Sequence, residues 1–329
     1  MKKVLKAVLC LALVAAFVAS LAGCAKFNYV TNGTIRAINE VKSGDWENGG
    51  AGGTAAGGEG EGAEGGDAAG DEAVIDALTP GTYGGVEFND LNAVAAYYKE
   101  AYDYTKTLTA QYKNEEGGTE TFYKFLGEDN LELEEILVDG KENATINKLV
   151  PGIMGGLFSK QINALPPAKN RNPDLDKDDE GQDFRTSYIT GDDLLAANVV
   201  DNGDGTITIT MQPKLTEMSV PGKDAQGHVF STLGDIGPTV ASISVVSFAQ
   251  GDYKDNIKVT YKGGTAVVKI NTSSKEIVEA EYTEMAYVAV THANIAIIKD
   301  KSASLTIKYW QKFPCSAEYM KETKGVTPA

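Results

Sequence analysis

Apolar and polar residues alternate along six stretches near the C-terminal end of the chain, which is the pattern of half-buried β-strands. These stretches are residues 239–248, 256–262, 265–271, 276–290, 293–299 and 302–313, and short polar turns separate most of them. In the last stretch one face carries Leu305, Ile307, Tyr309 and Phe313, and the other carries Thr306, Lys308 and Lys312. One apolar face and one polar face predict an antiparallel meander with one side packed on a core and the other in water.

A helix is predicted ahead of this region. Asn89 or Asp90 can cap it, and an apolar stripe recurs at helical spacing through Leu91, Val94, Ala95, Tyr98, Ala101, Tyr102 and Thr105. Further strands are expected at 107–113, 119–126 and 131–138, and a hairpin at 198–200 and 206–211, around a turn rich in Asp, Asn and Gly. The chain is therefore predicted to be α+β: a curved antiparallel sheet, a half-barrel-like meander, with one long and one or two short helices packed on one face.

A second helical pattern covers residues 146–158. Its apolar stripe is Ile146, Leu149, Val150, Ile153, Met154 and Leu157, but Pro151, Gly152, Gly155 and Gly156 interrupt it. Each interior glycine costs about 1 kcal/mol relative to alanine. The helix over residues 146–158 would therefore not be stable alone and is expected to pack against another part of the protein.

The N-terminus has the layout of an export signal. Lys2, Lys3 and Lys6 precede an apolar stretch over residues 7–21 that is too short for a membrane-spanning helix. The next residues, Leu21-Ala22-Gly23-Cys24, resemble the lipobox of bacterial lipoproteins. That resemblance is confined to the first 24 residues. It implies cleavage before Cys24, acylation of Cys24 and a lipid anchor on the outer face of a cell membrane.

The pattern predicts five regions along the chain: a signal peptide over 1–23, a lipidated segment with a possible short helix over 24–48, a flexible linker over 49–72, a single α+β domain over 73–315 and a tail over 316–329. The linker is assigned by composition, because 11 of residues 49–70 are glycine and six are alanine. Such a stretch cannot bury a core.

Charge and cysteine content limit the partners. The net charge is −16 at pH 7, and loss of the three signal-peptide lysines would make it −19, so electrostatic binding to nucleic acid is not expected. Of three cysteines, Cys10 would leave with the signal, Cys24 would be acylated and Cys315 would remain alone, so no internal disulfide is expected.

No catalytic machinery is visible. His228 and His292 are the only histidines, zinc-ligand spacing is absent and no nucleophile motif is present. We therefore expect no enzymatic activity and no cofactor. A calcium site is one interpretation of Asp174, Asp176 and Asp178, but Asp179 stands where an EF-hand loop needs glycine, and a solvated acidic loop is the alternative.

With the lipobox in front, the order of elements over residues 88–313 resembles the half-barrel of LolA- and LppX-type lipoprotein and lipid carriers. That resemblance implies an apolar cavity between sheet and helices, with residues 146–158 as a movable lid that lines a hydrophobic ligand site together with Tyr98 and Tyr102. The alternatives are a permanently packed connector and two tyrosines in the core. The rival function is a surface-displayed interaction or adhesion module that binds a glycan, peptidoglycan or protein without a ligand cavity. The linker and the lack of disulfides suggest a Gram-positive surface.

Overall fold

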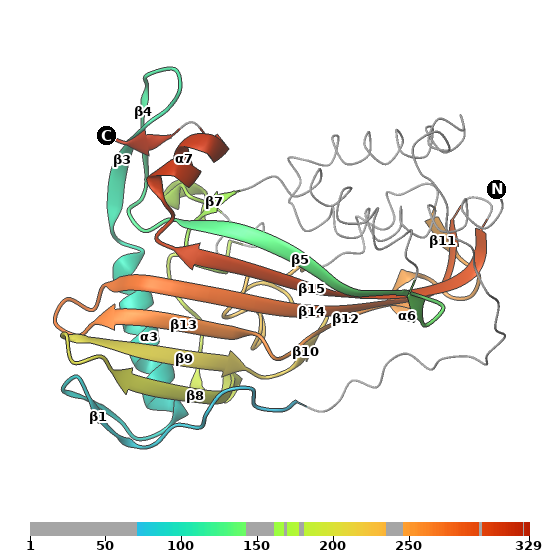
Figure 1. Ribbon diagram of the computed structural model, residues 1–329, viewed down its shortest axis with the longest axis horizontal. Coiled ribbons are helices and arrows are strands. Elements are labelled where there is room, and N and C mark those ends of the chain that lie inside the picture. The colour runs from blue at the N-terminus through green and yellow to red at the C-terminus, as the bar shows by residue number, and fades with distance from the viewer. Residues whose placement is uncertain are drawn as a thin grey trace.

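The computed structural model describes residues 71–142, 161–167, 170–177, 181–234, 246–295, 298–324 and 326–329. A large, curved and unclosed antiparallel sheet dominates these residues, and few helices accompany it (Figure 1). The predicted α+β class with a curved antiparallel sheet is confirmed.

The main sheet has eleven strands, seven of which form its continuous path. In spatial order these seven are β6 (Lys141–Glu142), β5 (Gly127–Val138), β15 (Ile298–Phe313), β14 (Ile277–Ile295), β13 (Thr265–Asn271), β9 (Thr206–Pro213) and β8 (Leu194–Asp201). Four short strands pair beside this path: β7 (Ile162–Asn163), β10 (Thr216–Glu217), β11 (Val246–Phe248) and β12 (Ile257–Tyr261). Along one edge, β14 pairs successively with β13, β12 and β11. This long strand therefore holds the short strands β11 and β12 in the same sheet as β13.

The long helix α3 (Leu91–Thr105) forms where its periodicity predicted it. Asp90, not Asn89, is the N-cap, and its carboxylate accepts a hydrogen bond from the backbone N–H of Ala93 at 2.9 Å. The apolar stripe packs against β9, β13 and the first half of β14 in the main core. Figure 1 shows α3 behind one end of the sheet, with β11 and α6 (Tyr253–Asn256) towards the other end.

The strands β14 and β15 differ from the predicted meander. Turns were expected around 291–294 and at 299–301, but both places lie inside long strands. There the pairing of β14 with β15 shifts register, and His292 and Asp300 take left-handed backbone angles, with φ of 50° and 52°. These are features of β-bulges, which interrupt the alternation of side chains without ending the strand. The prediction of two separate strands, 276–290 and 293–299, was therefore wrong.

A small second sheet lies beside one end of the large one (Figure 1). Its strands are β16 (Thr327–Pro328), β3 (Thr109–Lys113) and β4 (Thr119–Tyr123), in that order. Helix α7 (Ala317–Lys324) contributes Met320 to a core cluster with Tyr112, Phe122 and Tyr123. Residues 316–329, expected as a tail, thus carry a helix and a strand that pack on the domain, and α7 adjoins this small sheet.

The remaining short elements connect these layers. They are the hairpin of β1 (Gly81–Tyr83) and β2 (Val86–Phe88), and two 3₁₀ helices, η4 (Pro173–Leu175) and η5 (Gly191–Asp193). The predicted turn over residues 201–205 joins the C-terminal end of β8 to β9. Within it, Gly203 and Gly205 adopt φ angles of 72° and 81°. Asp71, which lies at the end of the predicted linker, accepts a hydrogen bond from the backbone N–H of Leu215.

Candidate functional site

The face of the large sheet that carries α3 is here termed the inner face. On β14, Ala280 and Tyr282 point to this face and pack in the main core. The pairing of β14 with β15 is continuous from Ala280 to Val290, so every second residue of that stretch shares this face. The inner face can therefore be followed from the α3 end to the far end of the sheet.

Beyond α3 the inner face becomes almost entirely apolar. We term this part the distal apolar surface; its members are 1–6% exposed and are Ile136, Ile257, Val259, Ala286, Val288, Val290, Leu305 and Ile307. Strand pairing joins them directly, since Val288 lies opposite Val259 on one side and Leu305 on the other. The two core clusters described above, around α3 and around the small sheet, include none of the eight. This surface is a separate apolar region of the same sheet.

A row of polar residues separates the distal apolar surface from the α3 core. Glu284 lies opposite Tyr309 on the inner face, and Gln311 lies one step nearer to α3. Glu284 is 6% and Gln311 is 2% exposed. Desolvation by burial raises the pKa of the Tyr309 hydroxyl well above its usual value, and the negative charges of Asp129 and Glu284 add to the rise. The inner face is thus divided into two apolar halves by a buried polar belt.

Asp129 anchors the belt at the β5 strand. Its carboxylate accepts hydrogen bonds from the Tyr309 hydroxyl at 3.0 Å, the Asn163 amide at 3.0 Å and the backbone N–H of Gln161 at 2.7 Å. Burial raises the pKa of this carboxyl, and the hydrogen bonds oppose that rise. The backbone carbonyl of Asp129 also accepts from Tyr319 of α7. Asp129 therefore joins β5, β7, β15 and α7 at one point.

The structure places Tyr98 and Tyr102 in the core, and neither has any exposed surface. The Tyr98 hydroxyl lies 2.8 Å from the Tyr282 hydroxyl, and the Tyr102 hydroxyl donates to the Phe184 carbonyl at 2.9 Å. Both side chains are thus fully engaged between α3 and its surroundings. We place neither of them on the candidate ligand surface.

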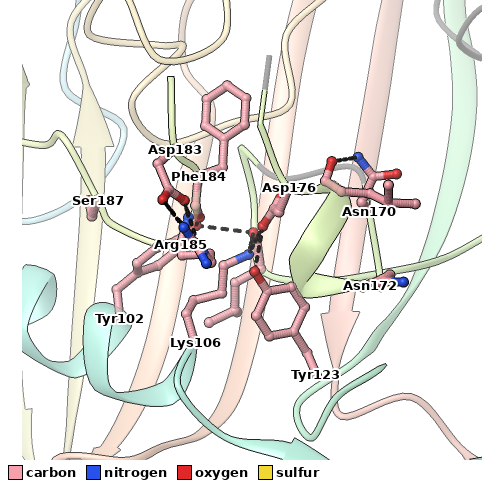
Figure 2. A network of polar contacts seen from close by, with 12 residues as sticks. Tyr102, Lys106, Tyr123, Asn170, Asn172, Asp176, Asp183, Phe184, Arg185 and Ser187 are labelled. Carbon is pink, nitrogen blue, oxygen red and sulfur yellow. Dashed lines mark hydrogen bonds and ion pairs between the residues drawn. The ribbon is translucent and has the colours of Figure 1, made fainter. Parts of the chain in front are cut away.

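Asp174 and Asp176, two of the three acids considered for calcium, point to different surroundings. The Asp176 carboxylate is fully buried and accepts from Lys106 Nζ at 2.7 Å and from the Tyr123 hydroxyl at 2.8 Å (Figure 2). Asp174 is exposed, and Asp178 lies outside the described residues. Among the described residues, no group of three or more His, Cys, Asp or Glu could hold a metal ion.

Lys106 is the second buried partner of this network. Its ammonium lies 4.2 Å from the centre of the Tyr123 ring, and its side chain is 2% exposed. Desolvation lowers the Lys106 pKa from 10.5 to about 8, although the Asp176 charge opposes that shift. The neighbouring pair of Arg185 and Asp183 is more exposed, and the Arg185 guanidinium lowers the Asp183 pKa to about 2 (Figure 2). This network links residues 170–177 and 181–187 to the C-terminal end of α3.

Cys315 and the two histidines lie in separate surroundings. Burial raises the pKa of the Cys315 thiol to about 12, so the thiol is protonated at neutral pH. His228 Nδ1 lies 3.0 Å from Asp193 Oδ2, and His292 Nδ1 lies 2.7 Å from Asp300 Oδ1. Both histidines pair with a carboxylate.

Several predicted site residues fall outside the described part of the chain. They are Cys24 and the apolar stripe of the second helical pattern: Leu149, Val150, Ile153, Met154 and Leu157. Conversely, two buried charges were not singled out from the sequence. Glu284 occupies an apolar phase of an alternating strand, and Lys106 follows the helix stripe at a buried position. The signal present in the sequence was a charged residue at a position where the periodicity predicts an apolar one.

Comparisons with protein-family models, with curated proteins and with solved structures found no match to this chain. Within the described ranges, no helix combines the length and apolar character needed to cross a membrane.

Proposed function

We propose that this chain is an extracytoplasmic lipoprotein, anchored by a lipid on Cys24, that binds a lipid or another hydrophobic ligand at the distal apolar surface. The lipobox pattern at residues 21–24 supports the anchor. The observation that carries the ligand proposal is the division of the inner face. A second apolar region, set apart from the α3 core by a buried polar belt, belongs to neither described core cluster. Its side chains are 1–6% exposed, so they form an interior apolar lining against which a hydrophobic ligand could be enclosed.

The polar belt also suits an amphiphile. Apolar chains gain about 25 cal/mol for each Å² of apolar surface removed from water. A polar head placed at the belt could exchange hydrogen bonds with buried side chains such as Gln311 and Tyr309. A carrier needs both features, because a purely apolar surface would not fix the orientation of its ligand.

The anchor has a direct test. We expect Cys24→Ala to abolish signal cleavage at this site and the added lipid mass on the N-terminal peptide, because acylation requires the thiol. The measurements are mass spectrometry of the N-terminal peptide and fractionation of cells into membrane and soluble parts. A matched control is Cys10→Ala, which leaves the lipobox intact and should leave both readouts unchanged. Normal processing of Cys24→Ala, or an unmodified wild-type N-terminal peptide, would contradict the anchor.

The ligand proposal is tested with Nile red, a neutral fluorescent probe of apolar sites, and with native mass spectrometry of the purified protein. Val288→Phe adds bulk at the centre of the distal apolar surface and should weaken probe binding about tenfold, a change of about 1.4 kcal/mol. Ala289→Phe is the matched control, because the next residue of β14 points to the opposite face. Thermal unfolding of both variants checks that the fold is kept.

Two results would contradict this part of the proposal. Absence of both probe binding and a copurifying amphiphile would remove the ligand and favour the surface-displayed interaction module. Probe binding that Val288→Phe leaves unchanged would place the ligand elsewhere.

A further inference from the structure

A pocket lined by both polar and apolar atoms lies between the β3–β4 hairpin and the 3₁₀ helix η4, away from the distal apolar surface. Its volume is about 410 Å³, which is within the range of small-ligand sites. One wall is the hairpin, through Thr109, Glu120 and Thr121, and the opposite wall is η4 with its cap residue. Figure 1 shows β3 and β4 at the opposite end of the molecule from β11.

The lining supplies many hydrogen-bonding groups around a small apolar base. It contains two hydroxyls, two carboxylates and one amide, together with a proline and a phenylalanine: Thr109, Thr121, Glu120, Asp174, Asn172, Pro173 and Phe122. An apolar ligand would cover these polar groups without pairing them, which is unfavourable. An anionic ligand would face both carboxylates. A neutral ligand that carries several hydrogen-bonding groups fits this lining, and a cation, which the two carboxylates would attract, is the alternative to be separated by experiment.

The base of the pocket is held rigidly. The Phe122 ring is 2% exposed and packs against Tyr112, with the ring centroids 5.4 Å apart and the rings tilted by 36°. The Arg171 guanidinium lies 4.6 Å from the Phe122 ring centre. In the described part of the structure, Arg171 Nε is buried and has no hydrogen-bond acceptor. This donor is buried against the Phe122 ring, and Arg171 is not one of the residues that line the pocket.

We infer that this pocket binds a neutral saccharide. Sugar hydroxyls both donate and accept, so they can pair with the Glu120 and Asp174 carboxylates and with the Asn172 amide in the same complex. The CH groups of the sugar ring can pack on Pro173, the apolar lining residue that is not fully buried. The site is independent of the proposed hydrophobic ligand, and either can fail without the other.

The test is saturation-transfer difference NMR on the full chain, with chitotriose, maltotriose and cellotriose as three neutral probes. We expect transfer to at least one of them, with a dissociation constant of about 1 mM. Thr109→Trp adds an indole at the pocket wall and should weaken that binding at least tenfold, or about 1.4 kcal/mol. Lys113→Trp is the matched control: it places the same side chain four residues along β3, at an exposed position outside the pocket, and should leave binding unchanged.

A second pair of measurements separates a saccharide from a cation. In the double variant Glu120→Gln, Asp174→Asn, the amide oxygens still accept hydrogen bonds from sugar hydroxyls, so saccharide binding should persist within about threefold. A cation such as spermidine would lose its partners. No transfer to any of the three sugars overturns the inference, as does binding that survives Thr109→Trp. Spermidine binding that the double variant abolishes, with no sugar binding, would make this a cation site instead.

Discussion

Asp176→Asn is expected to lower the free energy of unfolding by about 3–5 kcal/mol, because Lys106 must then either remain charged and buried without a counter-charge or give up its proton on folding. The Lys106 and Asp176 side chains are 2% and 0% exposed, and they lie 2.7 Å apart. Water cannot replace the lost carboxylate at such a site, and the Tyr123 hydroxyl loses its strongest acceptor. Urea denaturation followed by circular dichroism measures the change.

Two comparisons show whether burial is the cause. Asp183→Asn removes the carboxylate of a half-exposed ion pair with Arg185 in the same loop and should cost no more than about 1 kcal/mol. The double variant Lys106→Met, Asp176→Leu removes both buried charges and should be more stable than Asp176→Asn alone. Equal losses for Asp176→Asn and Asp183→Asn would contradict the buried-charge explanation.

The loop over residues 170–187 illustrates what the sequence could not predict. In the sequence, Asp176 stands among several acids and is best interpreted as part of a solvated loop. Its partner Lys106 is 70 positions away, so their pairing depends on the packing of α3 against this loop and leaves no local pattern. Helix α3, by contrast, was predicted to its cap, because a complete apolar stripe and a capping aspartate are both local signals.

The sheet was predictable where alternation is regular and not where a bulge interrupts it. The strand over residues 265–271 was predicted with its observed limits. At His292 and Asp300 the change of phase looked like the end of a strand, although the chain continues through both positions. Residues 316–329 were expected to form a tail, but Met320 of α7 and Val326 beyond it pack in the core cluster of the small sheet, a long-range contact that leaves no local pattern.

The candidate site, like the fold, could be predicted from the sequence only in part. Alternation identified which β15 residues share the inner face, including Leu305 and Ile307. The sequence does not show where along the inner face α3 stops covering the sheet. Nor does it show that Glu284 lies between two apolar halves, because both depend on tertiary packing. Sequence periodicity therefore predicted the face, and only the three-dimensional arrangement separates its core from its distal apolar surface.

Alkaline unfolding within about two pH units above pH 10 is the second large expected effect, because the core contains many tyrosines that cannot ionise while buried. Burial raises the pKa of Tyr98, Tyr102, Tyr261, Tyr282 and Tyr309 far above the usual value of 10. Above pH 10 the unfolded chain releases these protons and the folded chain retains them, so the folded state binds more protons and stability falls as pH rises.

The size of this effect follows from the number of tyrosines. Each contributes a slope of up to about 1.4 kcal/mol per pH unit, so five together approach about 7 kcal/mol per pH unit. A domain stability of about 5–15 kcal/mol would then be lost within roughly one to two pH units above 10. Lys106 acts in the opposite direction between its folded pKa of about 8 and its unfolded value of 10.5, because there the unfolded state binds the extra proton. One lysine cannot offset five tyrosines.

A pH titration that follows tyrosinate absorbance and far-ultraviolet circular dichroism together tests this prediction. The part of the absorbance change that comes from the buried tyrosines should coincide with the loss of the circular dichroism signal, because ionisation of the buried hydroxyls requires unfolding. Tyr104→Phe, at a position 41% exposed, should leave the midpoint unchanged. If the buried tyrosines ionise while the β-sheet signal persists, water reaches the core around Tyr98 and Tyr282 without unfolding. Their hydroxyl pair, 2.8 Å apart and inaccessible in the structure, would then be open to solvent in solution.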